Sequence, residues 1–124
     1  MNLDSGNRPT PAYSNGVRRH PRVMFSVPIL LHRLSAGGLK TTRGITLDLS
    51  QGGIGALVQG SLSIGETVQI DLPVATCMLG TVAIVRHTTS AVSGFEFLGL
   101  TDDEHTRLAA AINKALSEGT GLPS

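Results

Sequence analysis

The chain has 124 residues, of which 40% are hydrophobic and 15% are charged, and its formal net charge is +1. This composition predicts one globular domain and excludes an extended disordered protein. The net charge says little about nucleic-acid or membrane partners, but the cations are scattered outside one short cluster, which argues against a broad basic face for a nucleic-acid polymer. The apolar runs are too short to cross a bilayer, and the first residues show no signal-peptide pattern. We therefore expect a cytoplasmic protein without a membrane partner.

Residues 1–16 are rich in Asn, Ser, Pro and Gly, which predicts a flexible leader. A cluster of cations follows at Arg18, Arg19 and Arg22. Pro21 disfavours a helix here, so we expect an extended or turning segment. Guanidinium groups bind phosphate oxygens, pair with the O6 and N7 atoms of guanine, and stack on purine faces. Taken alone, the cluster is better explained as a solvated basic entry to the first strand.

Alternation of apolar and polar residues predicts about six strands. We expect them at about 23–31, 39–49, 54–58, 68–72, 79–86 and 92–98. In the second strand, Ile45, Leu47 and Leu49 share one face, which we expect to be the core face. Cys77 is the single cysteine, and we expect it to be buried as a small hydrophobic residue.

The pattern changes at Thr101, which begins a capping box that ends at Glu104. Leu108, Ile112 and Leu116 then recur every four residues, which predicts a helix that docks on a sheet. Strands followed by one helix predict a small antiparallel six-stranded β-barrel, or a curled sheet, with one C-terminal α-helix against it. We expect the domain to span residues 17–117 and residues 118–124 to form a flexible tail.

A second candidate binding segment ends the second predicted strand, at Asp48-Leu49-Ser50-Gln51-Gly52-Gly53. Asp48 and Ser50 share the polar face, since they are two positions apart on a strand. A carboxylate accepts from the N–H groups of a guanine edge, and a hydroxyl donates or accepts beside it. Gly52 and Gly53 permit positive φ and a close approach of a ligand to the backbone. Taken alone, this segment is more simply a hairpin turn.

Together the two segments resemble the motifs Arg-x-x-x-Arg and Asp-x-Ser-x-x-Gly of the PilZ domain family. The residues that match are Arg18 and Arg22, then Asp48, Ser50 and Gly53. The resemblance covers about residues 17–117. It implies a module that binds cyclic di-GMP, with the arginines gripping guanine and phosphate and the second motif on the other side of the ligand.

The resemblance also carries finer expectations for the ligand site. Arg19 would add a phosphate contact, and Gly52 lies within the second motif. Val17 stands before the first motif arginine, and a residue other than arginine there implies one ligand molecule rather than a stacked pair. We expect the arginine segment to close over the ligand and to signal through an effector protein that the sequence does not identify. The oligomeric state is not specified by the sequence.

Other classes of function fit less well. The four histidines show no metal-ligand spacing, and helix capping explains the acidic run at 102–104, so we expect no enzyme, metal or cofactor. A single-stranded nucleic acid binder would expose aromatic rings for stacking, whereas aromatic residues are only 3% of the chain. A PilZ-like protein adaptor that binds no nucleotide stays open as an alternative.

Overall fold

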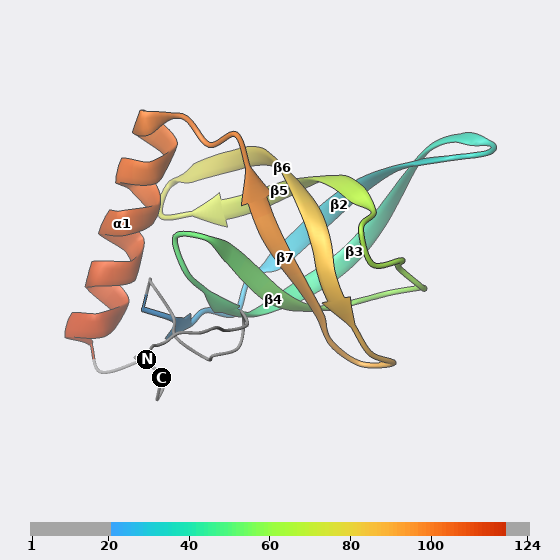
Figure 1. Cartoon of the computed structure of the whole chain (residues 1–124). Helices are drawn as coiled ribbons and strands as arrows, with labels where there is room; N and C mark the ends of the chain where they lie inside the picture. The colour runs from blue at the N-terminus through green and yellow to red at the C-terminus, as the bar shows by residue number, and fades with distance from the viewer. Residues whose placement is uncertain (1–20, 119–124) are drawn as a thin grey trace, which may run out of the picture.

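A computed structural model describes residues 21–118, and these residues form a six-stranded antiparallel barrel with one extra strand and one helix (Figure 1). The predicted fold class is therefore confirmed. The predicted leader, Val17, Arg18 and Arg19 lie outside the described residues, as does the chain after residue 118. The elements are β1 (Val23–Met24), β2 (Pro28–Ser35), β3 (Gly38–Leu49), β4 (Gly53–Val58), β5 (Thr67–Val74), β6 (Cys77–Thr88), β7 (Ser93–Leu98) and α1 (Asp102–Ser117).

The barrel is closed by hydrogen-bonded pairing all the way round. Its strands follow the order β3-β2-β5-β6-β7-β4, and β4 pairs with β3 to complete the ring. A closed ring leaves few exposed strand edges, which protects a small β protein from pairing with other chains. The first predicted strand is divided in two, because β1 pairs with the last two residues of β3 and β2 pairs with its first part.

The helix α1 lies across one end of the barrel, where it contacts β1 and β5 (Figure 1). Its capping box is present: the Thr101 hydroxyl accepts from the Glu104 amide at 3.1 Å, and the Glu104 carboxylate accepts from the Thr101 amide at 2.9 Å. Leu108 and Ile112 are buried, whereas Leu116 is 40% exposed, so the docking stripe is shorter than predicted. No helix among the described residues is long and apolar enough to cross a membrane.

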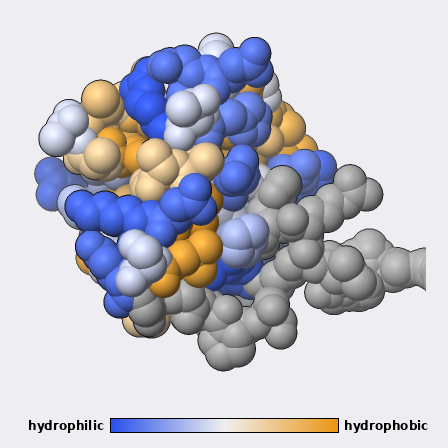
Figure 2. Space-filling model, turned by 90° about the vertical axis from the view of Figure 1, so that its left-hand side faces the viewer, coloured by the Kyte–Doolittle hydropathy of each residue, from blue (hydrophilic) through white to orange (hydrophobic). Residues whose placement is uncertain are grey.

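The core fills the barrel interior and continues under α1. The inward residues of β5 alternate as expected, with Val68, Ile70 and Leu72 at most 2% exposed. Phe95 and Phe97 of β7 lie on the same inward face and are 4% and 8% exposed. Figure 2 views the side of the molecule that carries α1; most of the described surface there is hydrophilic, with hydrophobic side chains in between. These inward apolar side chains therefore hold the strands of the barrel in register.

A β-bulge in β3 reverses which side chains face the core. The pairing of β3 with β4 skips Leu47, which is the extra residue of the bulge. Thr46 before the bulge and Leu49 after it both point inward and are 0% exposed. Ile45 and Leu47 are instead 50% and 39% exposed. The prediction that they join Leu49 in the core is therefore wrong, because the bulge breaks the alternation between them.

Cys77 also departs from expectation, because it is exposed rather than buried. It is the first residue of β6 and pairs with Val74 at the end of β5. Val74 is 1% exposed, so the margin of the core lies between these two residues.

Candidate ligand-binding site

Thr46 fastens the chain between β1 and β2 to the barrel. Its hydroxyl accepts a hydrogen bond from the Val27 amide at 2.8 Å and donates one to the Phe25 carbonyl. Its own amide donates to the Val27 carbonyl at 2.9 Å. These bonds satisfy a hydroxyl that is buried and would otherwise be costly to desolvate. Because β1 also pairs with the end of β3, Arg22 is fixed beside Asp48.

Arg22 and Asp48 form an ion pair in which the guanidinium Nη2 donates to the carboxylate Oδ2. The Asp48 side chain is 14% exposed and that of Arg22 is 34% exposed, so the pair lies partly out of water. The second carboxylate oxygen, Oδ1, accepts from the Gly55 amide at 3.1 Å. A guanidinium carries five N–H groups, so Arg22 keeps donors for a further partner. The ion pair thus fixes the position of the Arg22 guanidinium at the surface of the barrel.

The turn between β3 and β4 is organised by Ser50. Its hydroxyl oxygen accepts from the amides of Gly52 and Gly53 at 3.1 and 3.2 Å, and its amide donates to the Gly53 carbonyl at 2.9 Å. Serine commonly closes turns in this way. At Gly53 an added β-carbon would lie 1.9 Å from the Phe95 carbonyl oxygen, so no side chain fits.

One of the two reasons predicted for Gly52 and Gly53, a positive φ, is wrong. Among the described residues, positive φ occurs at Gly38, Gly60, Gly65 and Gly99, with Ala75 the one residue other than glycine. Gly52 and Gly53 therefore do not use the left-handed region. Gly53 is required because the backbone of β7 approaches it closely.

A pocket of about 280 Å³ lies over these groups and continues onto β6 and β7. Of the predicted site residues it brings together Arg22, Asp48, Ser50, Gly52 and Gly53. Arg18 and Arg19 lie outside the described residues. The lining residues that the sequence did not single out for the site are Ile54, Gly55, Arg86, His87, Val92, Gly94, Phe95 and Glu96.

A second β-bulge shapes the β6 side of this pocket. Val85 pairs with Phe95 and His87 pairs with Gly94, so Arg86 is the extra residue. Its Nε donates to Glu96 Oε1 at 2.5 Å, and the two side chains are 57% and 49% exposed. Bulges often redirect side chains next to functional sites. The bulge thus adds a second cation to the pocket lining.

His87 packs directly against Gly94. A β-carbon at position 94 would lie 2.1 Å from His87 Cε1, so the imidazole occupies the space that a side chain would need. His87 is exposed, as its place near the end of an apolar run predicts, but it also lines the pocket. The described residues contain no group of three or more side chains that could hold a metal ion.

Comparisons with known proteins identify the family and the fold. Residues 17–114 match the family model described as the PilZ domain. No curated protein matches the chain significantly. The PilZ domain of YcgR from Escherichia coli, solved with cyclic di-GMP, is 20% identical with a TM-score of 0.63, over 82% of this chain and 93% of that one.

Two longer proteins contain the same fold. The inhibitor of motility MotI/DgrA of Bacillus subtilis is 19% identical with a TM-score of 0.64, over 82% of this chain and 53% of that one. MrkH of K. pneumonia, solved as a complex with cyclic di-GMP, is 14% identical with a TM-score of 0.64, over 83% and 54%. The chain thus spans about half of each of these two proteins. Because the family model covers most of its length, the chain belongs to the PilZ domain family.

Proposed function

We propose that the chain is a cyclic di-GMP-binding module that takes its ligand in the pocket between Arg22 and the Ser50–Gly53 turn, and that it is not an enzyme. The observation that carries the proposal is the Arg22–Asp48 pair at this pocket, since it joins a phosphate-binding cation to a guanine-binding carboxylate. The structures of the YcgR PilZ domain and of MrkH, which share the fold, contain cyclic di-GMP.

Each group has a distinct part in this proposal. The remaining guanidinium N–H groups of Arg22 bind a phosphate or the O6 and N7 edge of a guanine. Each Asp48 oxygen keeps a lone pair beyond its present bond, and these accept from the N–H groups of the guanine. Ser50 holds the turn in shape, and Gly52 carries no side chain that would hinder the approach of the ligand to the turn.

The arginine segment supplies the rest of the proposed site. Arg18 and Arg19 lie outside the described residues, and we propose that they close over the bound dianion and add phosphate contacts. A ligand that binds only this closed arrangement shifts the segment toward it by the difference in affinity between the two arrangements. The closed segment would then form part of a surface for an effector protein.

Calorimetric titration with cyclic di-GMP tests the proposal, with cyclic di-AMP and GTP as competitors. We expect preference for cyclic di-GMP, because the Arg and Asp set suits a guanine edge. We also expect saturation at one ligand per chain, because Val17 stands where an additional arginine would favour a stacked pair. Equal affinity for all three nucleotides would contradict the guanine assignment. Absence of binding by the folded chain would support the alternative of an adaptor that uses the same fold without nucleotide.

A further inference from the structure

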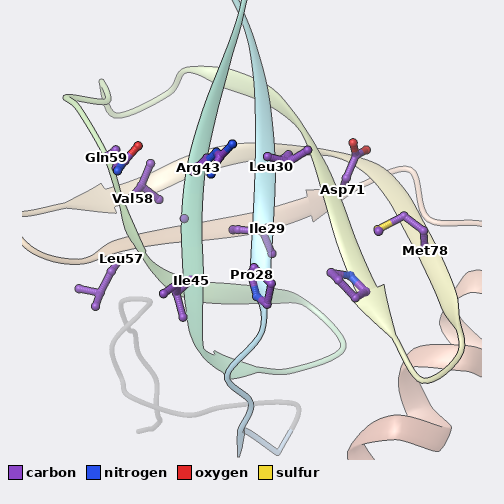
Figure 3. A pocket seen from close by; sticks show the side chains of 12 residues that line it. Pro28, Ile29, Leu30, Arg43, Ile45, Leu57, Val58, Gln59, Asp71 and Met78 are labelled. Atoms are coloured by element: carbon purple, nitrogen blue, oxygen red, sulfur yellow. The ribbon is translucent and has the colours of Figure 1, made fainter.

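The outer surface of β2, β3 and β5 carries a groove of about 700 Å³ on the described part of the molecule (Figure 3). Two rows of outward side chains cross neighbouring strands beneath it. The first row is Arg43, Leu30 and Asp71, which the strand register aligns directly. The second row is Leu57, Ile45, Pro28, Pro73 and Met78. Its pairings join Leu57 to Ile45, Ile45 to Pro28, and Pro73 to Met78.

The second row is apolar and exposed along its length. Leu57 is 42% exposed, Ile45 50% and Met78 61%. Ile45, the member of this row on β3, points away from the core because of the bulge at Leu47. A contiguous apolar patch on the surface of a small domain usually marks an interaction site.

The first row places a cation and an anion on either side of a leucine. Adjacent strands are 4.7–4.9 Å apart, so Arg43 on β3 and Asp71 on β5 are separated by about 10 Å across Leu30. Among the described residues Arg43 has no ion-pair partner. Asp71 Oδ2 is 2.7 Å from His32 Nε2, while its Oδ1 has no hydrogen-bond partner in the described part of the chain. Both charges therefore retain capacity for a partner that approaches this face.

We infer that this partner is a second copy of the chain, docked face to face about a two-fold axis parallel to β2. Such an axis exchanges the two sides of the row, so Arg43 of each copy faces Asp71 of the other and Leu30 faces its own equivalent. In the second row, Leu57 of one copy faces Met78 of the other.

The pattern favours a copy because a two-fold interface brings one patch against itself. An unrelated partner would need an anion opposite Arg43, an apolar group opposite Leu30 and a cation opposite Asp71, all at the same spacing. A second copy presents that order through symmetry alone. The net charge of +1 also leaves little repulsion between two copies.

This inference does not depend on the proposed nucleotide site. None of the residues in the two rows lines the pocket of Arg22. An Arg22→Ala variant should therefore associate like the unaltered chain, whether or not it binds nucleotide. Failure of one proposal leaves the other in place.

Sedimentation equilibrium of the full chain over a wide range of concentrations tests the interface. We expect a reversible dimer, and Arg43→Glu should weaken it roughly tenfold or more, because each copy then places a carboxylate against Asp71. Asp71→Arg should have a similar effect through two facing arginines. Lys114→Glu, at an exposed position of α1, makes the same change in net charge as Arg43→Glu and should leave the dimer intact.

Two combinations of the reversed charges distinguish this arrangement from general electrostatic attraction. The double variant R43E/D71R should dimerise again, because both pairs re-form with opposite sign. The two single variants mixed in equal amounts should form a heterodimer. In it, the two substituted side chains face each other with opposite charge, and the retained Arg43 of one chain faces the retained Asp71 of the other.

Two further measurements keep the test decisive. Circular dichroism checks that each variant is folded, and Leu57→Glu gives an independent disruption that leaves the His32–Asp71 contact unchanged. A chain that stays monomeric, or a dimer that neither Arg43→Glu nor Leu57→Glu weakens, would overturn the inference.

Discussion

Gly55 lies so close to Asp48 that a β-carbon at position 55 would be 3.2 Å from both carboxylate oxygens. At the same time, the Gly55 amide donates to one of those oxygens at 3.1 Å. The carboxylate is therefore held against bare backbone on one side and by Arg22 on the other. This arrangement ties the direction of the Asp48 side chain to a glycine that lies outside the recognised motif.

Gly55→Ala should consequently displace the Asp48 carboxylate by a few tenths of an ångström. We expect cyclic di-GMP binding to weaken about tenfold, since charge-assisted hydrogen bonds depend on short, aligned geometry. Gly37→Ala is the matched control, because an added β-carbon there meets nothing within 4 Å. Titration of both variants checks the prediction, and equal affinities would show that the position of Asp48 does not limit binding.

Arg22→Ala should remove a charge-assisted contact to the ligand. Such contacts contribute about 1.5–3 kcal/mol, so binding should weaken roughly ten- to a hundredfold. The fold should survive, because the Arg22 side chain is one-third exposed. Arg107→Ala removes an exposed arginine from an ion pair with Asp103 on α1 and serves as the control. Unchanged affinity of Arg22→Ala in calorimetry would contradict its place in the site.

Glu66 provides a prediction about the pH dependence of stability. Its carboxylate accepts two hydrogen bonds from Arg33, at 2.7 and 3.1 Å, and these lower the pKa of Glu66 below the usual 4.5 against an opposing effect of burial. A carboxyl with a depressed folded pKa stabilises the fold above its unfolded pKa and loses that contribution as the pH falls through the folded value.

Glu66→Gln should therefore lower the free energy of unfolding by about 1 kcal/mol near neutral pH. The difference from the unaltered chain should shrink as the pH falls from 4.5, where the carboxyl of the unfolded chain takes up a proton, through the lower pKa of the folded chain. Glu96→Gln alters a more exposed pair with Arg86 and should cost less. Urea denaturation at several pH values measures both variants; a Glu66→Gln deficit that is constant with pH would exclude this linkage.

Ligand binding should increase the protection of residues 15–22 against hydrogen exchange. The reason is that a dianion resting on Asp48 and the Ser50–Gly53 turn attracts the clustered arginines of this segment. The barrel from Phe25 to Phe97 should change little, since its pairing is complete without ligand. Exchange measured by mass spectrometry with and without cyclic di-GMP tests this expectation. Equal protection in both states would separate binding from the proposed closure.

Much of the fold follows from local sequence patterns. The capping box at Thr101 has a specific residue signature, and the alternation in β5 and β7 identifies their inward residues. The two bulges have no such signature. Ile45, Leu47 and Leu49 keep alternating through the first one, so only the pairing with β4 shows that the faces change there.

The candidate site is predicted from the arginine and aspartate motifs taken together, because each segment alone has a simpler explanation. The structure brings one residue of each motif, Arg22 and Asp48, into contact. The contact of His87 with Gly94 could not be read in the same way, because it depends on the β6–β7 register beyond the bulge at Arg86.

The unpaired position of Leu47 has a consequence for sequence comparison within the family. Thr46 and Asp48 pair with Ala56 and Gly55, which are neighbours in β4. A chain that lacked Leu47 would therefore keep every pair between β3 and β4, although it would lose the hydrogen bond from the Phe25 amide to the Leu47 carbonyl. The number of residues between the arginine and aspartate motifs can thus differ by one without changing the β3–β4 pairing at the candidate site. Alignments of related chains should allow a one-residue gap here and be anchored on the inward side chains.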